Sequence, residues 1–329
     1  MAYDKIKLEK GMYGVSKKSF TEVLEDLDPS KNYRGTELEN LDAYQRQLKR
    51  FDIKVSGNGC DNVEKFFTAS DSAVLFPEFI ARAVKQGLTA HDNALSSMLT
   101  VKTIIDGIDY RALNSPVISS SLSPVSETSA LPSVSVTTNN TLVALKKHGR
   151  VLSSSYEALR SQNLELFALI LRKIGSYIAM EQLNDAVSIL SSATTLSFQY
   201  EPPLDYSDLL RLWNVMFPFK LGAIIASSAT ILQILSLPEM KDATAGLDFQ
   251  ATGKMVTPFG ASLVKSDFLD VGTILGVDRE FSLQMIQSGG IKVDHDKVID
   301  QQLEKAAVSV TAGFSNIFVN SVKKMVAES

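Results

Sequence analysis

The sequence predicts an α+β fold, because helical and strand-like patterns are mixed along it without a steady βαβ rhythm. One helical pattern has apolar residues at spacings of 3, 4, 3 and 4 (Leu164, Phe167, Leu171, Ile174 and Ile178). Residues 222–227, "GAIIAS", form a short apolar run that is typical of a buried strand. The chain has 329 residues, 45% apolar and 21% charged, which is enough for one large domain or two medium ones.

The N-terminal part predicts an arm followed by a helix. Residues 1–35 have mixed charges and are interrupted by glycine and proline, so we expect an extended segment. Residues 36–51, "TELENLDAYQRQLKRF", predict an amphipathic helix, with Thr36 and Glu39 at capping-box spacing. Its apolar face consists of Leu38, Leu41, Tyr44, Leu48 and Phe51. The pattern alone leaves two alternatives open: this face packs on its own domain, or it packs on a neighbouring subunit.

Two more helices are expected before residue 200. The first covers residues 77–87, because proline suits the first helical position and glycine the residue after the last, as Pro77 and Gly87 would do here. The second is the strongest helical pattern in the chain and covers about residues 160–192. At 1.5 Å per residue the whole run would be roughly 45 Å long.

A long stretch of low charge lies between these helices. Residues 114–141, "NSPVISSSLSPVSETSALPSVSVTTNNT", contain one charged residue, Glu127, and show no lasting period. A strand–turn–strand pattern around Asp106-Gly107 leads into the stretch, and a strand-like segment follows it. Long loops without structure are uncommon in compact domains and are usually functional or linkers. We therefore expect a long, weakly packed hairpin.

The second half of the chain mixes shorter elements. The patterns predict a helix over 204–217 capped by Asp205 or Ser207, a helix from 228 that ends near Pro238, strands within 261–278, a hairpin that turns at Gly289-Gly290, and a short helix followed by a strand over 298–319.

Charge and cysteine content exclude several classes of protein. The net charge is −4 and no polybasic run occurs, which argues against tight nucleic-acid binding through phosphate neutralisation. The single cysteine, Cys60, excludes an intrachain disulfide and a multi-cysteine metal site. The N-terminus lacks the apolar core of a signal peptide, and the longest apolar stretch is interrupted by polar residues, so we expect neither secretion nor a membrane span.

Sequence motifs of catalysis are missing. No glycine-rich nucleotide loop and no nucleophile elbow occurs. The histidines are His91, His148 and His295, and none has a partner at helical metal-binding spacing. "DHD" at Asp294 to Asp296 is the best polar cluster; we expect a solvated strand end, with cation binding as the alternative. We therefore predict no catalytic, cofactor-binding or metal-binding residues and a protein that is not an enzyme, the competing interpretation being an unrecognised α+β enzyme.

Three segments carry a resemblance to a known family. They are "LDAYQRQLKRFDIKV" (41–55), "FFTASDSAVLFPEFI" (66–80) and "ILGVDREFSLQMIQSGGIKVDHDKVIDQQLEKAAVSVTAGFSNIF" (274–318). With the order of arm, helix, long loop, long helix and second mixed region, they resemble the major capsid protein of tailed bacteriophages, which has the Hong Kong 97-like capsid fold. The resemblance covers nearly the whole chain. It implies a coat protein that self-assembles into an icosahedral shell around double-stranded phage DNA; the alternative is an encapsulin-type shell around a protein cargo.

The resemblance also implies a division of the chain. The parts would be an N-terminal arm (1–72), a peripheral domain with a long spine helix (73–103 with 141–204 and 279–296), an extended E-loop hairpin (104–140) and an axial domain (205–278 with 297–329).

Contacts between copies would follow from the same resemblance. The arm would contact a neighbouring subunit, more than its own, through Leu38, Leu41, Tyr44, Leu48 and Phe51. The E-loop would do so through Asn114, Pro116, Ile118, Glu127, Leu131 and Pro132. Implied partners are the chain itself in hexamers and pentamers, packaged DNA held by weak non-specific contact, a portal, and scaffolding or decoration proteins, with no membrane and no cofactor. The protein would be located in the virion capsid, which would assemble in the host bacterial cytoplasm.

Cross-linking members of the family join an E-loop lysine to an asparagine of another subunit, aided by a buried glutamate. This sequence has no lysine between Lys102 and Lys146. We therefore expect a shell without covalent cross-links.

Overall fold

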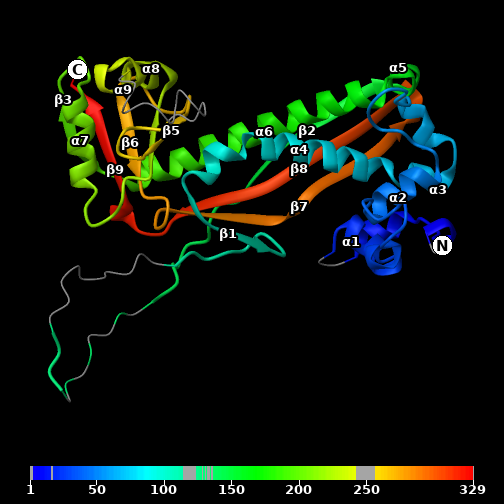
Figure 1. The fold of residues 1–329 in the computed structure, drawn as a ribbon, viewed down its shortest axis with the longest axis horizontal. Helices are drawn as coiled ribbons and strands as arrows, with labels where there is room; N and C mark the ends of the chain where they lie inside the picture. Colours follow the sequence, from blue (N-terminus) through cyan, green and yellow to red (C-terminus); the bar gives the residue numbers. More distant parts are fainter. Residues whose placement is uncertain are drawn as a thin grey trace. The chain divides into compact units, whose positions relative to one another are not determined.

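The structure is a computed structural model that describes residues 3–15, 18–113, 124–127, 129, 131, 134, 136–241 and 256–328. It confirms the α+β class, since helices and two sheets are mixed along the chain (Figure 1). The chain divides into two compact units. Unit 1 comprises Met1–His91, Lys147–Ala179 and Gly289–Thr311, and unit 2 comprises Asp92–Lys146, Met180–Ser288 and Ala312–Ser329.

Short helices replace the extended arm that was expected at the N-terminus. They are η1 (Tyr3–Lys5), η2 (Lys10–Gly14), α1 (Phe20–Leu27), η3 (Ser30–Tyr33) and α2 (Ala43–Arg50). Ser19 and Glu22 form a capping box at the start of α1. Phe20 and Leu24 bury the inner face of α1 in the core of unit 1. The expectation was wrong because the charged residues around these two apolar positions hide the helical period.

Helix α2 is shorter than predicted. Its capping box is formed by Asp42 and Gln45, whereas Thr36 and Glu39 precede the helix in turns. The elements η4 (Val63–Phe67) and α3 (Ser70–Ala73) follow α2.

Two long helices, α4 (Phe76–Ser96) and α6 (Leu164–Ala193), lie side by side in the parts that belong to unit 1 (Figure 1). The short α5 (Tyr156–Ser161) precedes α6. The prediction of α6 is confirmed, but α4 continues past Gly87, where the sequence predicted its end. Gly87 is a packing residue: a Cβ there would lie 1.9 Å from the carbonyl oxygen of Arg172. Gly175 on α6 is its counterpart, since its Cβ would lie 2.1 Å from the carbonyl oxygen of Val84.

The first sheet has the strand order β1-β7-β8-β2. Its strands are β1 (Leu99–Ile105), β7 (Leu283–Val298), β8 (Leu303–Asn316) and β2 (Lys146–Ser155). β1 pairs in parallel with β7, so the strands that flank the long loop do not pair with each other. The hairpin predicted at Gly289-Gly290 is wrong, because β7 runs through both glycines (Figure 1). The turn to β8 lies at η5 (Ile299–Gln301), followed by Gln302 with a φ of 52°.

The second sheet lies in unit 2 and has the order β3-β9-β6-β4-β5. Its strands are β3 (Leu196–Tyr200), β9 (Val322–Ala327), β6 (Thr273–Val277), β4 (Ala223–Ala226) and β5 (Ser262–Lys265). Unit 2 also holds α7 (Tyr206–Val215), α8 (Ser228–Ser236), α9 (Pro238–Lys241) and η6 (Val319–Ser321). Asp205 caps α7 and all four residues of β4 are buried, which confirms both predictions.

The pairing of strands differs in two places from the division that the resemblance implied. β3 was expected in the peripheral domain, yet it pairs with β9 in the five-stranded sheet. Residues 303–311 of β8 were expected in the axial domain, yet they belong to unit 1 and to the four-stranded sheet. The pattern of a strand shows its length and buried face but not the distant segment that pairs with it.

Each unit has its own core. In unit 1 the rings of Phe66, Phe76, Phe79 and Phe167 pack with centroids 5.5 to 6.5 Å apart. The buried residues of unit 2 form two clusters that include the strands of the five-stranded sheet. Within the described part of the chain, none of the helices combines the length and apolar character that a membrane span requires.

Candidate assembly surfaces

The apolar face of α2 packs inside its own chain. Leu38, Tyr44 and Leu48 are 5%, 2% and 5% exposed, whereas Leu41 and Phe51 are half-buried. The Tyr44 hydroxyl donates to the carbonyl oxygen of Leu75 at 3.3 Å, and burial raises the pKa of Tyr44 well above its usual value. This corrects the expectation that the face packs mainly on a neighbouring subunit.

A buried ion pair that the sequence analysis missed holds this segment in place. Arg46 is fully buried, and its Nε donates to Oδ2 of Asp28 at 2.9 Å. Its other nitrogens donate to the carbonyl oxygens of Asp28 and Leu41, at 2.5 and 2.7 Å. The guanidinium lies 4.4 Å from the ring centre of Tyr33, whose hydroxyl donates to Oδ1 of Asp28 at 2.6 Å. No sequence signal marks such an arginine, because the residues around it are typical of a solvated helix.

The long loop in unit 2 is paired at its base. Leu113 and Thr138 form an antiparallel bridge. The amide of Asn139 donates to the carbonyl oxygen of Ala112 at 2.7 Å. The amide of Val143 donates to the carbonyl oxygen of Tyr110 at 2.8 Å. The loop is thus a hairpin in its lower part, although the flanking strands β1 and β2 are not partners.

The loop residues singled out from the sequence are only partly described. Glu127 and Leu131 lie in the described part, and both are exposed, Leu131 by 78%. Asn114, Pro116, Ile118 and Pro132 lie outside the described residues. Further apolar side chains in the same loop are exposed as well, namely Leu113, Val125, Val134, Val136 and Leu142. An exposed apolar series with so little charge is a candidate surface for contact with another chain.

The "DHD" cluster does not form a metal site. Asp294 and Asp296 are exposed, whereas His295 points inward, because successive side chains of a strand alternate between faces. Among the described residues, no group of three His, Cys, Asp or Glu side chains converges as metal ligands would. The exposure of Asp294 and Asp296 agrees with the expectation that this strand segment is solvated.

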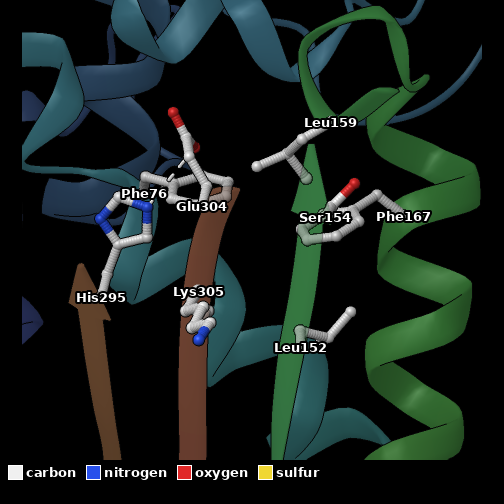
Figure 2. A pocket seen from close by; sticks show the side chains of 9 residues that line it. Phe76, Leu152, Ser154, Leu159, Phe167, His295, Glu304 and Lys305 are labelled. Atoms are coloured by element: carbon white, nitrogen blue, oxygen red, sulfur yellow. Dashed lines mark ion pairs between the residues drawn. The ribbon is translucent and has the colours of Figure 1, made fainter. Parts of the chain in front are cut away.

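His295 instead faces a buried carboxylate across the β7–β8 hairpin. Figure 2 shows His295 and Glu304 together beside Phe76, with a dashed line between the two polar side chains. The distance from His295 Nε2 to Glu304 Oε2 is 3.5 Å, and that from Lys297 Nζ to Glu304 Oε1 is 3.6 Å. The Glu304 side chain is 1% exposed. Neither its oxygens nor His295 Nε2 has a hydrogen-bond partner within the described residues.

The surroundings of this pair are apolar. The His295 ring stacks on Phe67 at 6.0 Å between centroids and meets the edge of Phe76 at 5.5 Å. A small pocket beside the pair is lined by residues from several elements of unit 1, including Leu152 and Ser154 on β2 and Phe167 on α6 (Figure 2). Burial lowers the pKa of His295, against the opposing effect of Glu304. A neutral imidazole and a carboxylate packed among phenylalanine rings fit a role in holding the end of the β7–β8 hairpin.

Comparison with known proteins finds relatives by structure alone. No protein-family model matches the sequence, and no curated protein matches it. The structure is similar to a virus-like particle from Pyrococcus furiosus, with 10% identity and a TM-score of 0.51 over 75% of this chain and 98% of that chain. It is also similar to the capsid of an empty GTA particle, with 12% identity and a TM-score of 0.52 over 72% of this chain and 90% of that chain. The capsid of the native GTA particle gives 12% identity and a TM-score of 0.51.

Because the sequence identities are 10–12%, these similarities show that the fold is shared and nothing beyond the fold. They span most of this chain and nearly all of each of the compared chains. The chain therefore has the Hong Kong 97-like capsid fold that the sequence resemblance implied.

Proposed function

We propose that this chain is the major capsid protein of a tailed bacteriophage and that its copies self-assemble into an icosahedral shell around double-stranded DNA. The observation that carries the proposal is the fold, because the compared chains that share it are described as capsids or as a virus-like particle.

The surface of the chain is consistent with this role. A lattice subunit must bury surface against several neighbours, and the same patches recur because the lattice is symmetric. The loop from Leu113 to Leu142 has exposed apolar side chains and one charge, so it can lie across a neighbouring copy without burying unpaired charges. We propose that Leu131 and Glu127 take part in that contact, together with Asn114, Pro116, Ile118 and Pro132.

The role proposed for DNA is confinement. The net charge is −4 and the sequence has no polybasic run, whereas tight DNA binding relies on clustered lysine and arginine that neutralise phosphates. DNA would then be enclosed through weak, non-specific contacts. The remaining partners would be a portal and scaffolding or decoration proteins. The shell would assemble in the host cytoplasm, and the protein would finally be located in the virion.

A second candidate is a shell that encloses a protein cargo. The observation in its favour is the likeness to the virus-like particle, which extends over 98% of that chain. The phage interpretation is preferred because two of the three compared chains are capsids and because the long N-terminal segment, 1–72, precedes the first long helix.

Two measurements on the purified protein test these alternatives. Negative-stain microscopy is expected to show closed particles of uniform diameter; small soluble species at every protein concentration would contradict both shell functions. The ultraviolet absorbance spectrum of particles purified from infected cells is expected to be that of nucleic acid. A protein spectrum, with a second protein co-purifying in fixed ratio, would favour the cargo shell.

A further inference from the structure

Only one asparagine in this chain is followed by glycine, and the pair lies on the surface of unit 1. The pair is Asn58-Gly59, within the segment "SGNGCDN" at residues 56–62, and both residues are exposed. The amide of Cys60 donates to the carbonyl oxygen of Gly57 at 3.1 Å, so this pair forms the centre of a tight turn. Gly59 has a φ of 82°, in the left-handed region that favours glycine.

The backbone nitrogen of Gly59 is open to reaction with the Asn58 side chain. This amide donates no hydrogen bond to any residue that the structure describes. Glycine has no Cβ that would shield its own nitrogen. Other parts of the chain do not crowd the position either, since a Cβ built on Gly59 would have no atom within 4 Å. Asparagine is among the chemically labile residues of proteins, and an unshielded nitrogen on the next residue is the group that attacks its side-chain amide.

We propose that Asn58 is a site of spontaneous deamidation, in which its side-chain amide is converted to a carboxylate without an enzyme. The backbone nitrogen of Gly59 forms a bond to Cγ of Asn58 and loses its proton, and ammonia leaves from Cγ. The product is a cyclic imide, which water then opens. Breakage of the new N–Cγ bond gives aspartate. Breakage of the original peptide bond gives isoaspartate, whose main chain runs through Cβ and Cγ and is therefore longer by one atom.

Both products add one negative charge to the turn, and the reaction consumes water, releases ammonia and needs no oxidant. The inference goes beyond the proposed shell function, because the reaction requires only the folded chain.

The turn adjoins the contacts that hold the start of α6. The carbonyl oxygen of Asp61 accepts from the amide of Leu164, the first residue of α6, at 2.9 Å. The amide of Val63 donates to the carbonyl oxygen of Gln162, also at 2.9 Å. Before the turn, the amide of Asp61 donates to the carbonyl oxygen of Lys54 at 2.9 Å, and the amide of Lys54 donates to Oδ2 of Asp61 at 2.8 Å.

The loop from Lys54 to Asp61 is thus closed at both ends, and a longer backbone in its turn has to displace one of them. Isoaspartate at position 58 is therefore expected to loosen the contact between Asp61 and Leu164, whereas aspartate keeps the ordinary backbone length.

Peptide mapping of the purified full-length chain, aged in warm and mildly alkaline buffer, tests the modification. Asn58 is expected to be converted to aspartate and isoaspartate, the latter detected by its methylation with isoaspartate methyltransferase. Asn40 is the internal control and should stay intact, because it is also exposed in a turn but is followed by Leu41. Conversion of Asn58 no faster than that of Asn40 would overturn the proposal, and this comparison within the wild type needs no variant.

A variant confirms the chemistry. Asn58→Gln should remain unmodified during the same ageing, because its longer side chain cyclises far more slowly. Asn58→Ser, which has no side-chain amide, is used if that variant misfolds. Appearance of a new acidic form of either variant, in the same proportion as in the wild type, would place the reaction at another residue and overturn the assignment to Asn58.

Amide hydrogen exchange separates the effect of the longer backbone from that of the added charge. Aged wild type is expected to exchange faster than fresh wild type in the first turn of α6, and aged Asn58→Gln should match the fresh protein. Fresh Asn58→Asp carries the charge without the longer backbone, so it should match as well. Equal exchange in fresh and aged wild type that contains isoaspartate would overturn the link between the turn and α6. Faster exchange in fresh Asn58→Asp would assign the effect to the charge and overturn the role of the longer backbone.

Discussion

Gly87 on α4 lies directly against the backbone of Arg172 on α6, so closely that a Cβ would come within 1.9 Å of the Arg172 carbonyl oxygen. Gly87→Ala therefore has to push the two helices apart. Overpacking of this kind typically lowers the free energy of unfolding by about 1–3 kcal/mol. Chemical denaturation of the unassembled subunit should measure the loss. The control is Gly290→Ala on β7, where the new methyl would have no atom within 4 Å; equal losses in both variants would contradict the close packing.

Arg46 neutralises a carboxylate that has almost no access to water, since Asp28 is 1% exposed. Arg46→Met should leave that charge buried and unpaired, which is expected to cost about 3–5 kcal/mol in the free energy of unfolding. Lys49→Ala is the matched control, because its 3.9 Å pair with Glu37 is exposed and should contribute less than about 1 kcal/mol. A loss for Arg46→Met no larger than for the control would show that the N-terminal helices do not depend on this network.

The buried imidazole predicts a dependence of stability on pH. Burial lowers the pKa of His295 in the folded chain, while Lys297 and Lys10 lower it further and Glu304 opposes them. The unfolded chain then binds a proton at higher pH than the folded chain, near the ordinary histidine value of about 6.5. The stabilising effect of a neutral His295 is thus present above that pH and is lost as the pH falls through it.

Thermal unfolding of the wild type and His295→Gln at a series of pH values checks this. The variant should lose less stability than the wild type between about pH 7 and pH 5.5. Asp294→Asn, at the exposed neighbouring position, is the control and should behave like the wild type, because its side chain lies in solvent and leaves His295 in place. Parallel curves for the wild type and His295→Gln would exclude His295 as the source.

The sequence predicted those elements whose cause is local. The 3–4 spacing from Leu164 to Ile178 marks α6, and the aspartate at 205 marks the start of α7. It failed where the cause lies in another part of the chain. Gly87 was interpreted as a helix end, because nothing near it in sequence shows that Arg172 approaches it. His295 could be singled out from the sequence, but its partner Glu304 could not, because the β7–β8 turn was predicted at Gly289-Gly290, which precedes His295.

Covalent cross-links between copies are not expected in this shell. The loop has no lysine between Lys102 and Lys146, and Lys146 is engaged by Asp185, with 2.6 Å between Nζ and Oδ1. Without an amine in the loop, no isopeptide bond to an asparagine can form there. Mature particles boiled in detergent and reductant should give a single band at the chain mass, 35.9 kDa. A ladder of dimers, pentamers and hexamers would contradict the expectation.

Copies of this chain are expected to build a closed shell, and a three-dimensional reconstruction of the particles by electron cryo-microscopy would show whether they do. The map is expected to show an icosahedral particle made of pentamers and hexamers, each subunit containing the four-stranded and five-stranded sheets, with the 114–141 loop lying on a neighbouring copy. A map of an isolated subunit or a small open oligomer, obtained under conditions in which the protein is fully folded, would contradict it.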